Sequence, residues 1–117
     1  MIAIICTDGQ LDIKQIENEC VKESWIPLLT ARNIEENKIY IPIFNLAGIA
    51  YQFCKRNLPQ SWYRGCVLLS DDDIAAIIKN GWEFMPLNHP RKLNEHPNFE
   101  LGFEIHDFKT KPDFKVS

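Results

Sequence analysis

Three consecutive aspartates, Asp71 to Asp73, are the most obvious candidates for metal chemistry in this chain. Paired carboxylates bind hard cations such as Mg²⁺. However, Ser70 is a favoured helix N-cap, Asp73 stands at the capping-box spacing, and negative charge is stabilised in the first turn of a helix. Consecutive helical side chains also diverge by roughly 100°, so neighbouring carboxylates do not converge on one ion. We therefore interpret this run as the start of a helix and predict no metal site.

Histidine and cysteine side chains are the other candidate metal ligands and nucleophiles. They are His89, His96, His106, Cys6, Cys20, Cys54 and Cys66. None of the short Cys or His spacings of zinc sites occurs among them, so any such site would have to be assembled by folding. Cys54 and Cys66 lie in apolar contexts and Cys20 lies among glutamates, and both settings disfavour the thiolate that a nucleophile needs. The sequence thus predicts no catalytic residue, no metal ligand and no cofactor, and it leaves open whether the three histidines converge.

A different kind of site is indicated by the segment Gln60–Gly65, which precedes a predicted strand. Its central residues are Trp62, Tyr63 and Arg64. Trp, Tyr and Arg dominate the hot spots of protein interfaces, and binding residues often lie on loops. The alternative is that they pack locally beneath the neighbouring helix. We predict that these three residues contact a protein partner.

Composition and charge exclude several classes of function. The chain has 117 residues, 45% of them hydrophobic and 25% charged, as in one ordinary globular domain spanning residues 1–117. The net charge of -3 and the scattered Lys and Arg provide no footprint for nucleic acid. The five glycines form no phosphate-binding loop. The opening apolar run Met1–Cys6 is too short for a signal peptide or a membrane span, so we expect a cytoplasmic protein with free thiols and no membrane partner.

Hydrophobic patterning predicts the elements that position these residues. Strands are expected at Ile2–Thr7, Trp25–Ala31, Lys38–Phe44, Cys66–Leu69, Trp82–Leu87 and Phe99–Phe108, the last of them an edge strand. Helices are expected from Leu46 to the break at Leu58-Pro59, with Asn45 as N-cap, and after Ser70 until Asn80-Gly81. Residues 11–21 fit either a strand or a helix, and the tail 110–117 is expected to fray. Together these elements predict an α+β fold: a mixed, largely antiparallel sheet of five to six strands with two helices packed mainly on one face.

Part of the chain also resembles a known family. The resemblance covers about residues 25–86 and depends on Lys38–Phe44, the helix with Ala50 and Phe53, Gly65–Ile74 and Gly81–Pro86. These segments resemble small bacterial domains of unknown function and the N-terminal domain of the type III secretion enhancer family. The resemblance implies a compact α+β fold in a bacterial cytoplasm, and it carries over no catalytic residue.

Two classes of function follow from these observations. We expect a non-enzymatic protein-binding module, such as a regulatory or immunity-type inhibitor, which contacts its partner through Trp62, Tyr63 and Arg64. The alternative is a small hydrolase or metal-dependent enzyme whose site is assembled by the fold from the histidines and a cysteine. An edge strand at Phe99–Phe108 would in addition allow a homodimer by strand pairing.

Overall fold

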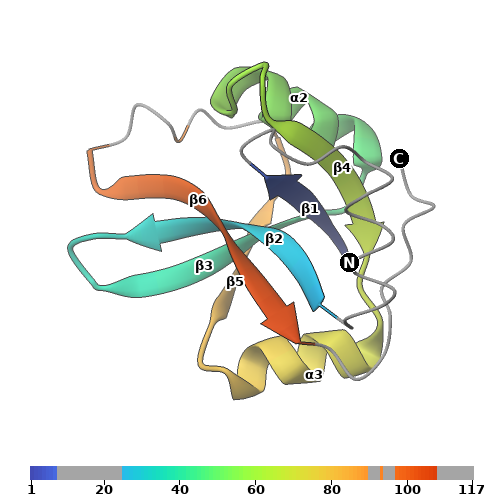
Figure 1. Cartoon of the computed structure of the whole chain (residues 1–117), viewed down its shortest axis with the longest axis vertical. Coiled ribbons are helices and arrows are strands. Elements are labelled where there is room, and N and C mark those ends of the chain that lie inside the picture. Colours follow the sequence, from blue (N-terminus) through green and yellow to red (C-terminus); the bar gives the residue numbers. More distant parts are fainter. Residues whose placement is uncertain (8–24, 90–92, 94–96, 108–117) are drawn as a thin grey trace.

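The structure is a computed structural model that describes residues 1–7, 25–89, 93 and 97–107. In this part of the chain, six strands form one sheet and two helices pack against it (Figure 1). The strands are β1 (Ile2–Thr7), β2 (Trp25–Asn33), β3 (Lys38–Phe44), β4 (Tyr63–Leu68), β5 (Glu83–Leu87) and β6 (Phe99–Asp107). The helices are α2 (Ala47–Asn57) and α3 (Asp71–Lys79). The predicted α+β fold is confirmed, whereas the predictions for residues 11–21 and 110–117 lie outside the described residues.

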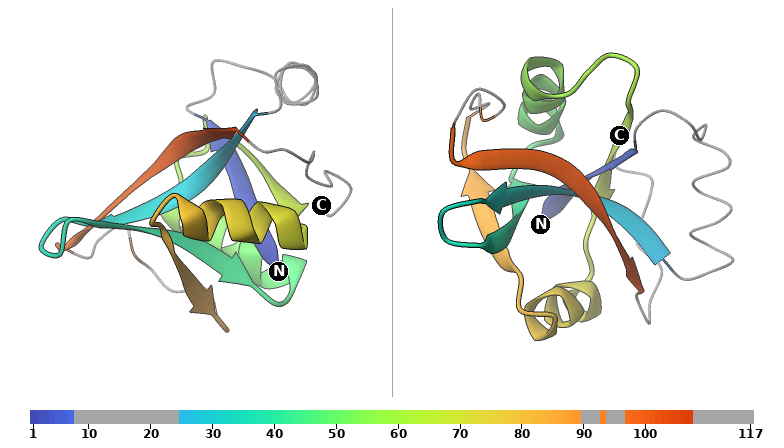
Figure 2. Two further views of the ribbon diagram at one scale, coloured as in Figure 1. Left: turned by 90° about the horizontal axis from the view of Figure 1, so that it is seen from below. Right: turned by 60° about the vertical axis from the view of Figure 1, so that its left-hand side comes forward.

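The strand order is β4-β1-β2-β3-β5, with β6 paired to β2 and a further contact between β1 and β3. All of these pairings are antiparallel except that of β3 with β5. Because β1 contacts β2 at only one pair, Ile5 with Leu28, the two strands diverge and the sheet twists strongly (Figure 2). Within the described residues, β4, β5 and β6 each have one neighbouring strand, which makes all three of them edge strands.

The hydrophobic core lies on both faces of the sheet. Alternate residues of β1 point to opposite faces, so Ile4 and Cys6 join the cluster beneath α2, whereas Ala3 and Ile5 join the cluster beneath α3. The two helices lie at opposite ends of the molecule in Figure 1. The prediction that both helices pack mainly on one face is therefore wrong in this detail. β1 is apolar on both faces and buried throughout, as expected for a strand covered on two sides.

Helix α3 begins with the predicted capping box. The Asp73 N–H donates to Oγ of Ser70, the Ser70 N–H donates to Oδ2 of Asp73, and both distances are 3.2 Å. Asp73 is buried, whereas Asp71 and Asp72 are exposed, so the three carboxylates serve the helix start as expected. At α2, the N-cap is Leu46 and no side chain caps the helix, which corrects the prediction of Asn45.

Two further differences concern the strands. β4 begins at Tyr63, three residues before the predicted Cys66, because residues 63 to 68 all pair with β1. β2 runs from Trp25 to Asn33, two residues beyond the predicted end at Ala31, because Arg32 and Asn33 still pair with β3 and β6.

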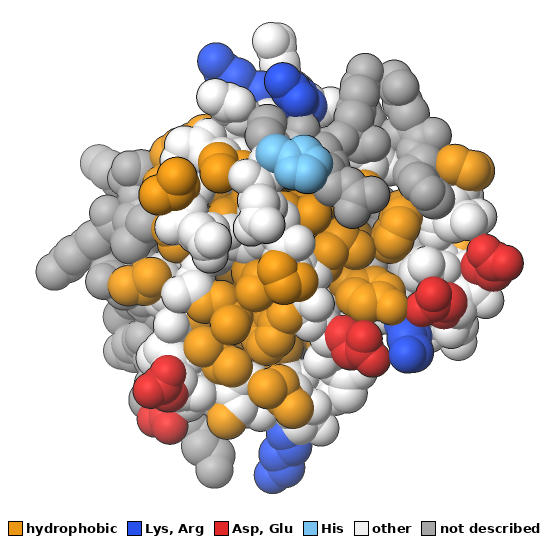
Figure 3. Space-filling view, turned by 180° about the vertical axis from the view of Figure 1, so that it is seen from behind, with side chains coloured by type: hydrophobic (Ala, Val, Ile, Leu, Met, Phe, Trp, Pro, Cys, Tyr) orange, Lys and Arg blue, Asp and Glu red, His pale blue; other side chains and the backbone are white. Residues whose placement is uncertain are grey.

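The surface opposite the view of Figure 1 carries a group of hydrophobic side chains at its centre, with acidic side chains toward its margins (Figure 3). The large hydrophobic side chains that are exposed among the described residues are Met1, Ile34, Leu46, Leu68 and Ile78. No helix in the described part of the chain is long and apolar enough to cross a membrane.

Candidate functional site

The predicted partner-binding residues lie at the corner where α2 ends and β4 begins. Trp62 is half-buried in the connection, and its ring meets that of Phe103 in β6 edge-on, with centroids 5.9 Å apart. Trp62 therefore anchors the connection to the sheet. For this residue, the structure agrees with the alternative of local packing. Tyr63 pairs with Thr7 of β1 through its backbone, and its side chain lies outside what the structure describes.

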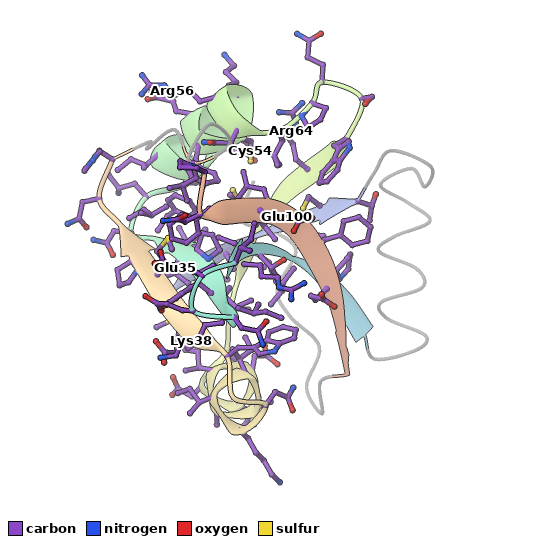
Figure 4. The ribbon with its side chains drawn as sticks, turned by 90° about the vertical axis from the view of Figure 1, so that its left-hand side faces the viewer. Glu35, Lys38, Cys54, Arg56, Arg64 and Glu100 are labelled. Carbon is purple, nitrogen blue, oxygen red and sulfur yellow. The ribbon has the colours of Figure 1, made fainter. Side chains whose placement is uncertain are left out.

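Arg64 is fixed by two backbone carbonyls. Its Nη1 donates to the carbonyl oxygen of Cys54 and its Nη2 to that of Pro59, both at 3.0 Å. The C-terminal end of a helix carries partial negative charge, so a guanidinium group is well placed there. Figure 4 shows Arg64 and Cys54 close together at this end of α2, whereas Arg56 lies on the other side of the helix. Arg64 thus stabilises the corner. Both of its acceptors are neutral carbonyl groups, so they do not cancel its positive charge.

Beside Arg64 lies a hollow of about 310 Å³, which we call the corner hollow; it is lined by Tyr51, Lys55, Gln60 and Arg64. Two of these four side chains are cations. Among the residues that the structure describes, neither Lys55 nor Arg64 forms an ion pair with a carboxylate. Within the described residues, the corner hollow therefore carries two cations without a paired carboxylate, on a protein whose net charge is -3.

The chain folds this way because several local signals agree. Lys55 and Arg56 occupy the last turn of α2, where cations favour the helix dipole. The helix ends at Asn57, with Leu58 as its C-cap before Pro59, and the chain then reverses into β4. Antiparallel pairing of β4 with β1 brings Arg64 opposite Cys6, on the face of the sheet that α2 covers. The side chains from helix, turn and strand meet only because of this packing.

Arg64 was predicted from the sequence and Gln60 begins the predicted segment, whereas Lys55 and Tyr51 were not predicted. The basic pair at the end of a predicted helix was a detectable signal for Lys55. Its closeness to Arg64 was not detectable, because it depends on how the start of β4 packs against the end of α2.

A second, smaller hollow of about 130 Å³ lies on the surface of β2 and β6, lined by Thr30, Arg32, Glu100, Leu101, Gly102, Phe103 and Glu104. Its charges are mixed, since Arg32 lies opposite Glu100 in the strand register. The Arg32 guanidinium also donates to Oδ1 of Asn37 at 3.0 Å. The second hollow therefore has a lining of mixed charge, one cation and two carboxylates, whereas both charged side chains of the corner hollow are cations; we prefer the corner hollow as the candidate site.

The described thiols are unsuited to nucleophilic chemistry. Cys6, Cys54 and Cys66 are free and buried in the cluster beneath α2. Burial, with the neighbouring Cys66, raises the pKa of the Cys54 thiol to about 12. Burial also raises the pKa values of Cys6 and Cys66, although a hydrogen bond from Tyr51 partly offsets the change at Cys66. All three remain protonated thiols at neutral pH, in agreement with their expected role in core packing.

The histidines form no site that the structure reveals. His89 is exposed. His96 and the side chain of His106 lie outside the described residues, so their convergence stays a prediction of the alternative function. In residues 1–7, 25–89, 93 and 97–107, no group of three His, Cys, Asp or Glu side chains is placed to hold a metal ion.

Comparisons with known proteins add no relative: no family model, curated protein or solved structure matches this chain. The resemblance to the type III secretion enhancer N-terminal domain stays a prediction from the sequence.

Proposed function

We propose that this protein is a non-enzymatic protein-binding module of the regulatory or inhibitor type, which contacts its partner at the α2–β4 corner. The observation that carries the proposal is the corner hollow, where Lys55 and Arg64 lie together without a carboxylate among the described residues. Arg and Tyr, which both line this hollow, are enriched in protein interfaces, as is Trp, and Trp62 lies in the same α2–β4 connection. The partner accordingly presents acidic groups to this surface.

Pre-organisation of the charge supports binding. Arg64 is already immobilised by its two carbonyl bonds, so little side-chain freedom is lost when a partner docks against it. Lys55 is exposed at the end of α2, where it attracts an acidic surface from a distance and increases the association rate. Both effects favour recognition of a macromolecule that carries negative charge.

The compartment proposed for this function is the cytoplasm. Cys6, Cys54 and Cys66 are free thiols that lie in one hydrophobic cluster. Reduced cysteines are the rule in cytosolic proteins. The proposal thus combines a reduced core with an acidic protein partner in the same compartment.

A charge reversal at Lys55 tests the proposal without disturbing the fold. Alanine at Trp62 or Arg64 removes packing and hydrogen bonds of the corner, so loss of binding in such variants would be ambiguous. Lys55 is exposed and forms no described hydrogen bond, and Lys79 provides a matched control because it is also exposed in the last turn of a helix. We expect capture of a stoichiometric partner from a lysate of the source cells to be lost with Lys55→Glu and retained with Lys79→Glu. Equal capture by both variants would contradict the proposal.

A further inference from the structure

The corner hollow presents more hydrogen-bond donors than the described structure uses. A guanidinium group has more N–H donors than the two bonds that Arg64 makes to the carbonyl oxygens of Cys54 and Pro59. Lys55 and Gln60 end in an ammonium group and a carboxamide group, and neither side chain forms a hydrogen bond or an ion pair within the described structure. Donors from a helix, a turn and a strand therefore line one hollow and have no acceptor there.

The charge of the lining indicates which acceptor fits. None of its four side chains is acidic, and two are cations. A carboxylate brings a single negative charge, whereas a phosphate monoester brings a charge of about -1.5 to -2 at neutral pH and three acceptor oxygens. Two carboxylates would also balance the cations, but they repel each other when they are held in one small space. Charge and the number of donors therefore favour a phosphate monoester.

The corner hollow also has room for the group that carries the phosphate. Its volume of about 310 Å³ lies within the usual range of ligand pockets, roughly 300 to 1,000 Å³. Tyr51 contributes a ring and Lys55 an aliphatic chain, so part of the lining is apolar. Tyr51 is held by a hydrogen bond to Cys66, and Arg64 by its two carbonyl bonds. Half of the lining side chains are thus fixed before a ligand arrives, which reduces the entropy lost on binding.

From these observations, we infer that the acidic group of the partner is a phosphorylated side chain, whose phosphate enters the corner hollow between Arg64 and Lys55. This inference rests on the proposed function, because it specifies what the partner presents to the same corner. It also gives the complex a switch. The unphosphorylated side chain has a neutral hydroxyl group in place of the phosphate, so attachment and removal of the phosphate turn binding on and off.

An NMR titration of the whole chain tests the chemistry of the site. The probe is N-acetyl-phosphoserine methylamide, and the controls are the same compound with serine and with glutamate. We expect the phosphoserine compound to shift the backbone amide signals of Lys55, Gln60 and Arg64 and to bind about tenfold or more tightly than the glutamate compound. The serine compound should shift none of them.

A matched pair of substitutions tests the location. Gln60→Glu replaces a donor by a carboxylate of nearly the same shape, so we expect it to weaken binding of the phosphoserine compound about tenfold or more. Gln52→Glu is the control, because Gln52 is also exposed and is not part of the lining. It should leave binding unchanged. Equal effects of the two substitutions would overturn the assignment of the phosphate to the corner hollow.

Treatment of the captured partner with a phosphatase distinguishes a phosphorylated protein from a small phosphate ester. We expect dephosphorylation to abolish capture. The inference is overturned if millimolar phosphoserine compound leaves the amides of Lys55, Gln60 and Arg64 unshifted, or if the phosphoserine and glutamate compounds bind equally. If capture depends on Lys55 but survives dephosphorylation, the inference fails and the proposed binding module stands. If the compound binds but capture does not depend on Lys55, the proposed function fails as well, and the corner hollow is a site for a small phosphate ester.

Discussion

The guanidinium group of Arg64 lies 3.0 Å from the carbonyl oxygen of Cys54, and this contact joins the start of β4 to the last turn of α2. The same carbonyl accepts the N–H of Leu58 at 2.9 Å, so the end of the helix and the turn share one acceptor. Pro59 has a similar role, because its carbonyl accepts from both Arg64 and the N–H of Trp62. The cation that we assign to partner binding is therefore also a structural element.

This double role predicts different effects for the two cations of the corner hollow. Arg64→Ala should lower the free energy of unfolding by about 1 to 2 kcal/mol, because two carbonyls lose a charged donor. Lys55→Ala should change it by less than about 0.5 kcal/mol, since Lys55 is exposed and makes no described bond. Urea unfolding of both variants measures the difference. Equal destabilisation would mean that Arg64 does not hold the corner together.

The side chain of Asn57 joins the end of α2 to Leu93, which is distant in the chain. Its buried side chain donates to the carbonyl of Phe53 at 2.9 Å and accepts from the N–H of Leu93 at 2.6 Å. Asn57→Ala should lower the free energy of unfolding by about 2 to 3 kcal/mol, because buried backbone groups lose their partners. The matched change Asn80→Ala, at an exposed position, should have a much smaller effect in the same unfolding assay. Similar losses at both positions would contradict the role of the buried amide.

The capping box of α3 predicts unequal roles for the three aspartates. Asp73→Ala should cost about 1 to 2 kcal/mol of unfolding free energy, because it removes the acceptor for the Ser70 N–H. Asp72→Ala should cost less than about 0.5 kcal/mol, since that exposed carboxylate interacts mainly with the helix dipole. Thermal or urea unfolding distinguishes the two. If added Mg²⁺ stabilised the wild type but neither variant, the aspartates would be metal ligands after all.

The buried thiol of Cys54 predicts a pH dependence of stability. Its pKa rises from the usual value near 9.0 to about 12 in the folded protein, first through burial and then through Cys66. Because the folded state keeps a proton that the unfolded state releases, this contribution is fully present below about pH 9 and is lost as pH rises toward 12. Between these limits, the unfolding free energy of the wild type should fall more steeply than that of Cys54→Ala, by up to about 1.4 kcal/mol per pH unit. Parallel pH profiles would show that Cys54 ionises equally in both states.

Much of the fold could be predicted because the decisive patterns are local. The apolar run Ile2–Thr7 and the segment Lys38–Phe44 have the same limits in sequence and structure, and Ser70 starts its helix through neighbours within three residues. The faces covered by the helices could not be predicted in this way. β1 is apolar on both faces, so its sequence pattern does not show that α2 covers one face of the sheet and α3 the other.

The candidate site was only partly predictable for a related reason. Trp62 and Arg64 stand out by residue type, but their structural partners are the Phe103 ring and the backbone carbonyls of Cys54 and Pro59. A backbone carbonyl has no signature in the sequence, so the structural role of Arg64 was hidden. The meeting of Lys55 with Arg64 depends in turn on pairing of β4 with the N-terminal strand, far away in the chain.

The central claim is that an acidic protein partner binds at the α2–β4 corner. Its most direct test is the dissociation constant of the captured, purified partner with wild type, Lys55→Glu and Lys79→Glu, measured by calorimetry at low and high salt. We predict that Lys55→Glu weakens binding by about tenfold or more, that Lys79→Glu matches the wild type, and that salt weakens wild-type binding more than that of Lys55→Glu. The same dissociation constant and salt dependence for all three proteins would contradict the claim.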